Sequence, residues 1–237
     1  MIESSSLSTV VLGSLASALG YALALATLAV AVTGNGWLVS ADAPITRWMV
    51  DHRAGALDDV ARAVTTAGGP PEHAAICIVV AALMVWRTKR YLPAIVLLGT
   101  VAAATVLCTV LKLVVDRARP PLSVQLILET DPSFPSGHVT GTAALAAMMA
   151  LVLTGNAPTT MRRLAALAVV VVTAIVAATR VYLGVHWLSD VCAGALTAAL
   201  AVTLGMLALR LLEQRSTGTP SHRTTAHSVD HTISGAS

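Results

Sequence analysis

Phe134-Pro135-Ser136-Gly137-His138 is a short break between two long apolar segments of the chain. Pro135 disfavours helical backbone in the residue before it, and Gly137 lets the backbone approach a ligand closely. Because apolar residues resume directly afterwards, the sequence predicts that a helix begins between Ser136 and His138. The free N–H groups at a helix start bind anions, and Ser136 and His138 add a hydroxyl and a group that titrates near neutral pH. The stretch is therefore either an ordinary turn or one wall of an anion site.

The composition indicates a membrane protein. Of the 237 residues, 56% are apolar and 11% are charged, and the mean hydropathy is +0.77, whereas a soluble domain has about 25% charged residues. The formal net charge is only +3, and no basic stripe with interleaved aromatic residues is present, so we expect no nucleic-acid partner. Cys77, Cys108 and Cys192 all lie in apolar runs and are expected to be buried and unpaired.

Six apolar stretches are expected to cross the membrane as helices, because they do not alternate as the strands of a β-barrel do. This predicts an all-α fold, a bundle of six transmembrane helices. The expected helices cover residues 7–32, 73–86, 92–115, 138–153, 164–182 and 187–212.

Two further segments lie outside this bundle. Residues 37–72 carry apolar side chains mainly at three- and four-residue spacing, which predicts one or two amphipathic helices at the membrane surface, capped by Asp42 or Asp58. Residues 213–237 contain almost no large apolar residue, which predicts a disordered cytoplasmic tail. We therefore expect a membrane-embedded domain over residues 1–212, without a cleavable signal peptide. The tail histidines are interpreted as solvated rather than as metal ligands; they are His222, His227 and His231.

The distribution of positive residues bears on orientation. Six spans place both termini on one side of the membrane, together with the basic residues near 87–90, 162–163 and 210–223. The other side carries a similar number of basic residues, four of which are Lys112, Arg117, Arg119 and Arg180. If these four bind a ligand or face its site, the remaining bias makes the termini cytoplasmic and the other end extracytoplasmic.

Lys112, Arg119 and Arg180 all fall at span ends on the side that carries the Pro-Ser-Gly-His stretch. A single cation at such a place usually extends to the membrane surface. Three cations on one face suit a phosphate, because guanidinium groups donate paired hydrogen bonds to phosphate oxygens. Charged groups at membrane depth are costly unless paired or liganded, so the cluster predicts a functional site.

His186 and Asp190 are four residues apart, which would place them one turn apart on one face of a helix. A carboxylate beside one imidazole nitrogen fixes the tautomer and leaves the other nitrogen free to act as a nucleophile or base. His138 is then the second histidine that a two-step phosphoryl transfer requires. A zinc site formed by His138, His186 and Asp190 is the alternative, although three nearby cations would repel a metal.

Three motifs together resemble the signature of the type 2 phosphatidic acid phosphatase superfamily, which also includes lipid phosphate phosphatases, undecaprenyl pyrophosphate phosphatases and vanadium haloperoxidases. The motifs are Lys112-(six residues)-Arg119-Pro120, Pro135-Ser136-Gly137-His138 and Thr179-Arg180-(five residues)-His186-(three residues)-Asp190. They span about a third of the chain, and the six-helix layout extends the resemblance to residues 7–212. Thr179 stands where the family usually has Ser, and its stiffer side chain is expected to alter the hydrogen bond to phosphate.

The resemblance implies roles for individual residues. The implied phosphate-binding set is Lys112, Arg119, Ser136, Gly137 and Arg180. His186 would attack phosphorus and form a phosphohistidine, with Asp190 orienting it. His138 would protonate the leaving group and then activate water. No metal or other cofactor is implied, because the cations offset the charge that develops during transfer.

The leading hypothesis is an integral enzyme of the plasma membrane that removes phosphate from a lipid phosphate or pyrophosphate at the extracytoplasmic face. One alternative is a lipid phosphotransferase that uses the same intermediate, and another is a non-catalytic membrane protein that binds phospholipid. Phosphatidic acid, phosphatidylglycerol phosphate, polyprenyl pyrophosphate and polyprenyl phosphoribose are all compatible substrates. The Ala, Val and Arg bias indicates a high-GC bacterium and favours a polyprenyl-linked role in the cell wall.

Overall fold

The computed structural model describes residues 2–34 and 36–217 of the chain. These residues form eight α-helices and two short 3-10 helices, so the predicted all-α class is confirmed. The helices are α1 (Ile2–Thr33), η1 (Trp37–Val39), α2 (Asp42–Asp51), α3 (Gly55–Ala67), α4 (Pro70–Thr88), α5 (Tyr91–Val115), η2 (Leu122–Val124), α6 (Gly137–Thr154), α7 (Thr159–Tyr182) and α8 (Leu188–Thr217).

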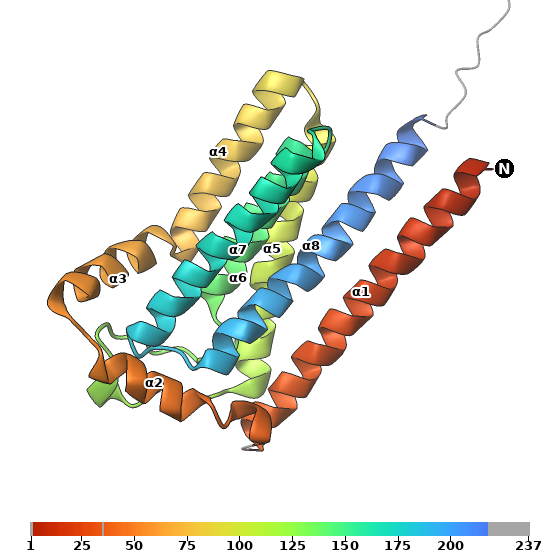
Figure 1. The fold of residues 1–237 in the computed structure, drawn as a ribbon. Coiled ribbons are helices and arrows are strands. Elements are labelled where there is room, and N and C mark those ends of the chain that lie inside the picture. The colour runs from red at the N-terminus through yellow and green to blue at the C-terminus, as the bar shows by residue number, and fades with distance from the viewer. Residues whose placement is uncertain (1, 35, 218–237) are drawn as a thin grey trace, which may run out of the picture.

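Six of these helices, α1 and α4 to α8, are long and apolar enough to cross a membrane. They run side by side, and α2 and α3 lie across one end of the bundle (Figure 1). The start of α1 and the end of α8 lie at the opposite end. The predicted number of spans is confirmed, with α8 continuing to Thr217, five residues beyond the expected end. The predicted tail histidines lie outside the described residues.

Helix α6 packs against α5, α7 and α8, and α4 covers the side formed by α5 and α6. Small side chains let these helices approach closely, as is usual where helices pack within a membrane. At Gly194 of α8, an added Cβ would lie 2.8 Å from the carbonyl oxygen of Ser136 and 3.2 Å from Cβ of Val139. The absence of a side chain at Gly194 therefore holds the first turns of α8 directly against the start of α6.

The Pro-Ser-Gly-His stretch is anchored by the only phenylalanine in the chain. Phe134 is fully buried and packs with Leu25 and Val32 of α1 and with Ala193 of α8. Burying a phenyl ring stabilises the fold by about 2 kcal/mol. Helix α1 thus contributes to the site indirectly, by closing the apolar pocket that fixes the loop before α6.

The segment between α1 and α4 forms two amphipathic helices, as the sequence predicts. The predicted caps are wrong, because Ala41 and Ala54 occupy the N-cap positions and neither makes a side-chain cap. Asp42 lies inside the first turn of α2 and is buried. Its carboxylate instead accepts hydrogen bonds from Arg117 and Ser189, which are distant in the sequence.

The three cysteines are free. Cys77 and Cys108 are buried, as expected, whereas Cys192 is exposed on α8. The expectation of burial is wrong there because an apolar residue of a membrane helix can face lipid as readily as a helix neighbour.

Candidate active site

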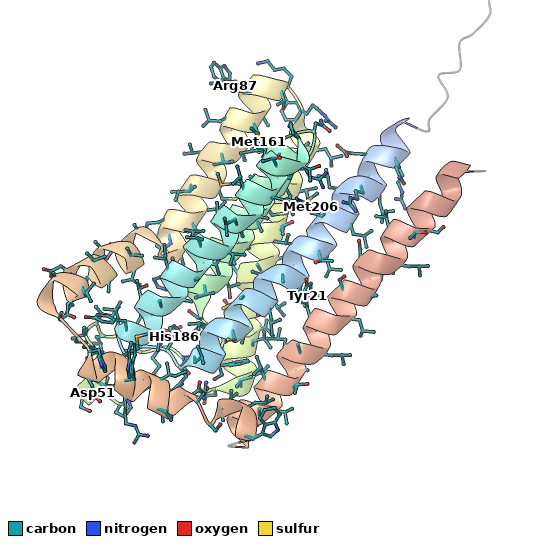
Figure 2. The ribbon with its side chains drawn as sticks, in the orientation of Figure 1. Tyr21, Asp51, Arg87, Met161, His186 and Met206 are labelled. Atoms are coloured by element: carbon teal, nitrogen blue, oxygen red, sulfur yellow. The ribbon has the colours of Figure 1, made fainter. Side chains whose placement is uncertain are left out.

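The predicted site residues converge at the end of the bundle that carries α2 and α3. His186 and Asp51 lie at this end, whereas Arg87 and Met161 lie at the other (Figure 2). Four segments meet there: the last turn of α5, the loop of residues 116–136, the start of α6, and the turn of residues 183–187 between α7 and α8. The loop and the turn are joined where the N–H group of Leu126 donates to the carbonyl oxygen of Leu183 at 2.9 Å.

His186 lies in the turn before α8 and not on the helix itself, because α8 begins at Leu188. The prediction that His186 and Asp190 lie on one face of a helix is therefore wrong. The two side chains are nevertheless in contact, because the turn brings His186 to Asp190. Gly184 allows this turn, because its φ of +71° is strained for any residue with a side chain. The turn buries His186 to 1% exposure, and the ring contacts Arg119 of the loop of residues 116–136.

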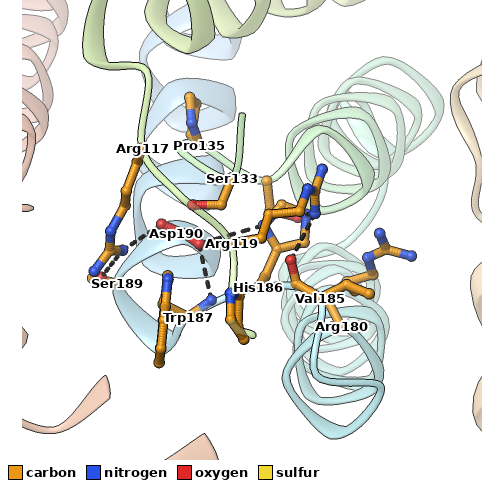
Figure 3. Close-up of polar contacts among 12 residues, drawn as sticks. Arg117, Arg119, Ser133, Pro135, Arg180, Val185, His186, Trp187, Ser189 and Asp190 are labelled. Carbon is orange, nitrogen blue, oxygen red and sulfur yellow. Dashed lines mark hydrogen bonds and ion pairs between the residues drawn. The ribbon is translucent and has the colours of Figure 1, made fainter. Parts of the chain in front are cut away.

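The ring of His186 lies between a carboxylate and a guanidinium (Figure 3). Its Nδ1 faces Oδ2 of Asp190 at 3.5 Å, and its Nε2 lies 3.2 Å from Nη1 of Arg119. The Nδ1 contact is longer than an ordinary hydrogen bond. Burial lowers the pKa of His186 to about 4, against the opposing effect of Asp190. The imidazole is therefore neutral at physiological pH.

Arg119 and Lys112 share one carboxylate at the mouth of the site. Asp131 accepts a bond from Nη2 of Arg119 at 2.7 Å and pairs with Nζ of Lys112 at 2.9 Å. Lys112 also donates to the carbonyl oxygen of Pro132, and Arg119 to that of Val185 at 2.6 Å. Burial alone would raise the pKa of Asp131, but Lys112 and Arg119 outweigh it and lower that pKa to about 2.

Arg180 is fully buried at the end of α7. Its Nη1 donates to Oγ1 of Thr65 on α3 at 2.6 Å, and its Nη2 to Oε1 of Glu129 at 2.5 Å. Burial alone would raise the pKa of Glu129, but Arg180 and Arg119 outweigh it, so this pKa lies below its usual value. Thr179, the residue that departs from the family pattern, donates its hydroxyl to the carbonyl oxygen of Val176 within α7.

We call the three cations and the two acids that pair with them the cavity network. Its members are Lys112, Arg119, Glu129, Asp131 and Arg180. The two carboxylates occupy donors that also suit phosphate oxygens. Lys112 and Arg119 line the cavity itself, whereas Arg180 is fully buried behind Glu129, to which it donates.

The start of α6 forms the facing wall. The helix begins at Gly137 with Ser136 at the N-cap, as predicted. The backbone N–H group of Ser136 donates to the carbonyl oxygen of Asp190 at 3.0 Å, which joins this wall to α8. The hydroxyl of Ser136 is buried and has no hydrogen-bond partner among the described residues. Gly137 and His138 face the cavity, whereas Ser136 lies behind them.

A cavity of about 790 Å³ joins these groups. The chemically active residues that line it are Lys112, Arg119, Glu129, Asp131, His138 and His186. Away from them, the cavity continues between α4 and α5 along apolar side chains. Ile78, Val106 and Leu113 line it and are themselves 61%, 62% and 73% exposed, so the cavity reaches the lateral surface of the bundle.

The comparisons with known proteins agree with this geometry. The family model described as the PAP2 superfamily matches residues 93–213, slightly more than half of the chain. The chain belongs to the PAP2 superfamily. Phosphatidylglycerophosphatase B of Bacillus subtilis (strain 168) is 30% identical over 169 residues, which cover 70% of this chain and 82% of that protein.

Two solved structures share the fold. The crystal structure of a transmembrane PAP2 type phosphatidylglycerolphosphate phosphatase from Bacillus subtilis aligns with a TM-score of 0.70 at 26% identity, covering 87% of this chain and 98% of that one. The structure of LpxE from Aquifex aeolicus aligns with a TM-score of 0.57 at 20% identity, covering 70% and 95%, and supports the fold alone. The chain is thus a multi-pass membrane lipid phosphatase of the PAP2 superfamily.

The structure of this PAP2 protein also contains site residues that the sequence did not reveal. Glu129 and Asp131 complete the cavity network, yet they stand in a polar loop with no spacing signal. Behind His186, Arg117 bonds to Asp190, Ser189 and Asp42. We call these last four residues the buried network. The sequence predicted for Arg117 only a general place among the basic residues that bind a ligand or face its site, and it predicted a helix cap for Asp42.

Proposed function

We propose that this PAP2 enzyme hydrolyses a phosphomonoester on a membrane lipid through a phosphohistidine at His186. One observation carries the proposal: His138 and His186 line the same cavity as Lys112 and Arg119. The nucleophile, the proton donor and the charge-stabilising groups of a phosphoryl transfer are therefore available at one place.

In the first step, Nε2 of His186 attacks phosphorus as a neutral imidazole, and a P–N bond forms. Asp190 faces Nδ1 and stabilises the positive charge that develops on the ring. The P–O bond to the lipid breaks, and His138, in its protonated form, gives its proton to the departing lipid oxygen. The products of this step are a lipid alcohol and phosphohistidine.

In the second step, neutral His138 accepts a proton from water, and the resulting hydroxide attacks phosphorus. The P–N bond breaks, inorganic phosphate leaves, and His186 and the protonated His138 are restored. Lys112, Arg119 and Arg180 hold the phosphoryl oxygens throughout, after the phosphate has displaced Glu129 and Asp131 from them. The N–H group of Gly137, at the start of α6, adds a hydrogen bond, whereas the N–H group of Ser136 already donates to the carbonyl oxygen of Asp190.

The shape of the cavity favours a lipid substrate. Its charged end holds the phosphate, and its apolar extension between α4 and α5 suits an acyl chain that enters from the bilayer. The names of the Bacillus subtilis relatives make phosphatidylglycerol phosphate the first substrate to test. We also propose that the enzyme lies in the plasma membrane with cytoplasmic termini, because most of the basic residues outside the site lie at the end of the bundle that carries the termini.

Phosphate release by the detergent-purified protein tests the reaction. The panel is phosphatidylglycerol phosphate, phosphatidic acid and polyprenyl pyrophosphate, each with EDTA present and with the His186→Ala protein alongside. We expect release that persists in EDTA and disappears in the variant. Quenching the reaction in base should trap an acid-labile phosphoenzyme in the parent protein. Activity in a folded His186→Ala protein contradicts the proposed mechanism, and phosphate transfer to an added alcohol in place of water would identify a phosphotransferase.

Labelling tests the orientation. In a protein whose three native cysteines are replaced by Ser, Asp51→Cys places a thiol at the site end and Met161→Cys places one at the opposite end (Figure 2). Both positions are exposed. A membrane-impermeant maleimide added to intact cells should label only the Asp51→Cys protein. The reverse pattern places the site on the cytoplasmic face.

A further inference from the structure

The acid beside His186 belongs to a buried cluster that reaches the surface helix α2. Arg117 donates from Nη1 to Oδ1 of Asp190 at 2.5 Å and to Oγ of Ser189 at 2.7 Å, and from Nη2 to Oδ2 of Asp42 at 2.7 Å. Asp42 in turn accepts from the backbone N–H group of Ser189 at 2.9 Å and from its hydroxyl at 2.6 Å. The side chains of Arg117, Asp42 and Asp190 are only 12%, 7% and 0% exposed.

The two carboxylate oxygens of Asp190 contact different groups. Oδ1 is held by Arg117, whereas Oδ2 accepts from the backbone N–H group of Trp187 at 2.9 Å and faces Nδ1 of His186 (Figure 3). With both oxygens fixed, the carboxylate has one orientation relative to the imidazole. The ring of Trp187 also lies 5.6 Å from the Arg117 guanidinium, which limits the movement of that side chain.

The charges of Asp42, Arg117 and Asp190 also bear on how well the cluster stabilises a protonated His186. Arg117 alone would cancel the negative charge of Asp190, and a neutral pair stabilises an imidazolium poorly. Asp42 adds a second negative charge on the far side of Arg117, so that the trio carries a net charge of about −1. Because the trio is buried, solvent screens these charges weakly, and each is felt at His186.

We propose that Arg117 and Asp42 are positioning residues, which orient Asp190 and set the charge that His186 experiences when it attacks phosphorus. The inference rests on the proposed function, in which His186 is the nucleophile. It also assigns a task to α2: this amphipathic helix supplies one of the charges behind the active site. Asp42 and Arg117 touch neither the cavity nor the reacting atoms, so they act through Asp190.

The test compares charge changes of opposite sign. Asp42→Asn removes a negative charge, which disfavours the His186 imidazolium, so the acidic limb of kcat/KM should move to lower pH. Arg117→Gln removes a positive charge, so the limb should move to higher pH. Each shift should be about one pH unit. In the double variant the two charge changes cancel and the net charge is again about −1, so the limb should return toward that of the parent although the rate stays lower.

Other charged groups that face His186 are unchanged in every variant. They are Asp190 of α8, Arg180 of α7, His138 of α6 and Arg119 of the loop. Dividing each variant's kcat/KM by that of the parent at the same pH, on the same lipid in a neutral detergent, removes the ionisation of the substrate. Ser189→Ala is the matched variant inside the buried network that changes no charge, and Asp51→Asn is the matched exposed acid on α2. Neither should move the limb.

Purified variants are first checked for a single peak in gel filtration and a parent-like thermal transition. If Arg117→Gln does not fold, the test uses Asp42→Asn and Arg117→Lys instead. The acidic limb of kcat/KM should then move to lower pH in Asp42→Asn and stay in place in Arg117→Lys. Shifts of the same sign for Asp42→Asn and Arg117→Gln, or no shift in a folded Asp42→Asn protein, overturn the inference. Activity in His186→Ala is a different result, because it overturns the proposed function itself.

Discussion

The two networks that meet at His186 use similar groups in different surroundings. The carboxylates of the cavity network are partly exposed, with Asp131 at 52% and Glu129 at 25% of the side chain. Those of the buried network, Asp42 and Asp190, are at 7% and 0%. Exposed ion pairs contribute little to stability and exchange readily, whereas breaking a buried pair leaves an uncompensated charge. The difference suggests that the cavity network exchanges its acids for substrate, while the buried network stays assembled throughout the reaction.

Replacing His186, which lies between the two networks, should have the largest effect on activity. His186→Ala deletes the proposed nucleophile and should lower kcat by about 10⁴-fold or more. Single-turnover phosphate release measures this directly. The matched variant is His52→Ala, which replaces an exposed histidine of the segment between α2 and α3 and should leave kcat within about twofold of the parent.

Weakening one cation of the cavity network should have the next largest effect. Arg119→Lys keeps the charge but loses the fork that contacts Asp131, Val185 and His186. We expect kcat/KM to fall about 100-fold, since bidentate contacts to phosphoryl oxygens are lost where charge develops. Arg62→Lys, an exposed change on α3, serves as the control. If kcat/KM fell only because KM rose, with kcat unchanged, Arg119 would bind the substrate and the transition state equally.

Removing an exchangeable acid should have a smaller effect of the opposite sign. Asp131→Asn takes away a carboxylate that pairs with Lys112 and Arg119, the proposed phosphate ligands. KM should fall by about two- to fivefold, because exposed ion pairs are weak. Steady-state kinetics at low and high salt check this, and the difference from the parent should shrink as salt increases. A higher KM would show that Asp131 serves to position the cations.

The last prediction concerns the pH dependence of stability and not catalysis. The pKa of His186 lies near 4 in the folded protein, below about 6.5 in the unfolded chain. The unfolded state therefore binds more protons between these values, so this contribution is fully present above about pH 6.5 and is lost as the pH falls toward 4. It amounts to about 3 kcal/mol. In thermal unfolding in detergent, the stability of the parent should fall relative to that of His186→Gln as the pH is lowered from about 6.5 to 4, whereas the difference between the two proteins should be constant above about pH 6.5.

The sequence predicted the parts of this enzyme that leave local signals. Long apolar runs predicted the six spans, and three short motifs located His138, His186 and Asp190. Glu129 and Asp131 could not be found in this way, because a carboxylate in a polar loop looks the same whether it pairs with a cation or faces water. Asp42 and Arg117 are 75 residues apart, and only the folded bundle shows that an acid at the start of α2 belongs with Asp190.

The opening of the cavity between α4 and α5 has a consequence for how affinity should be expressed. Ile78, Val106 and Leu113 line the cavity and are exposed at the flank of the bundle, so a lipid can reach the site by diffusing within the membrane plane. The relevant concentration is then the mole fraction of substrate among the surrounding lipids or detergent molecules. Adding inert detergent at a fixed amount of substrate should slow the enzyme by surface dilution, although the number of substrate molecules per litre is unchanged.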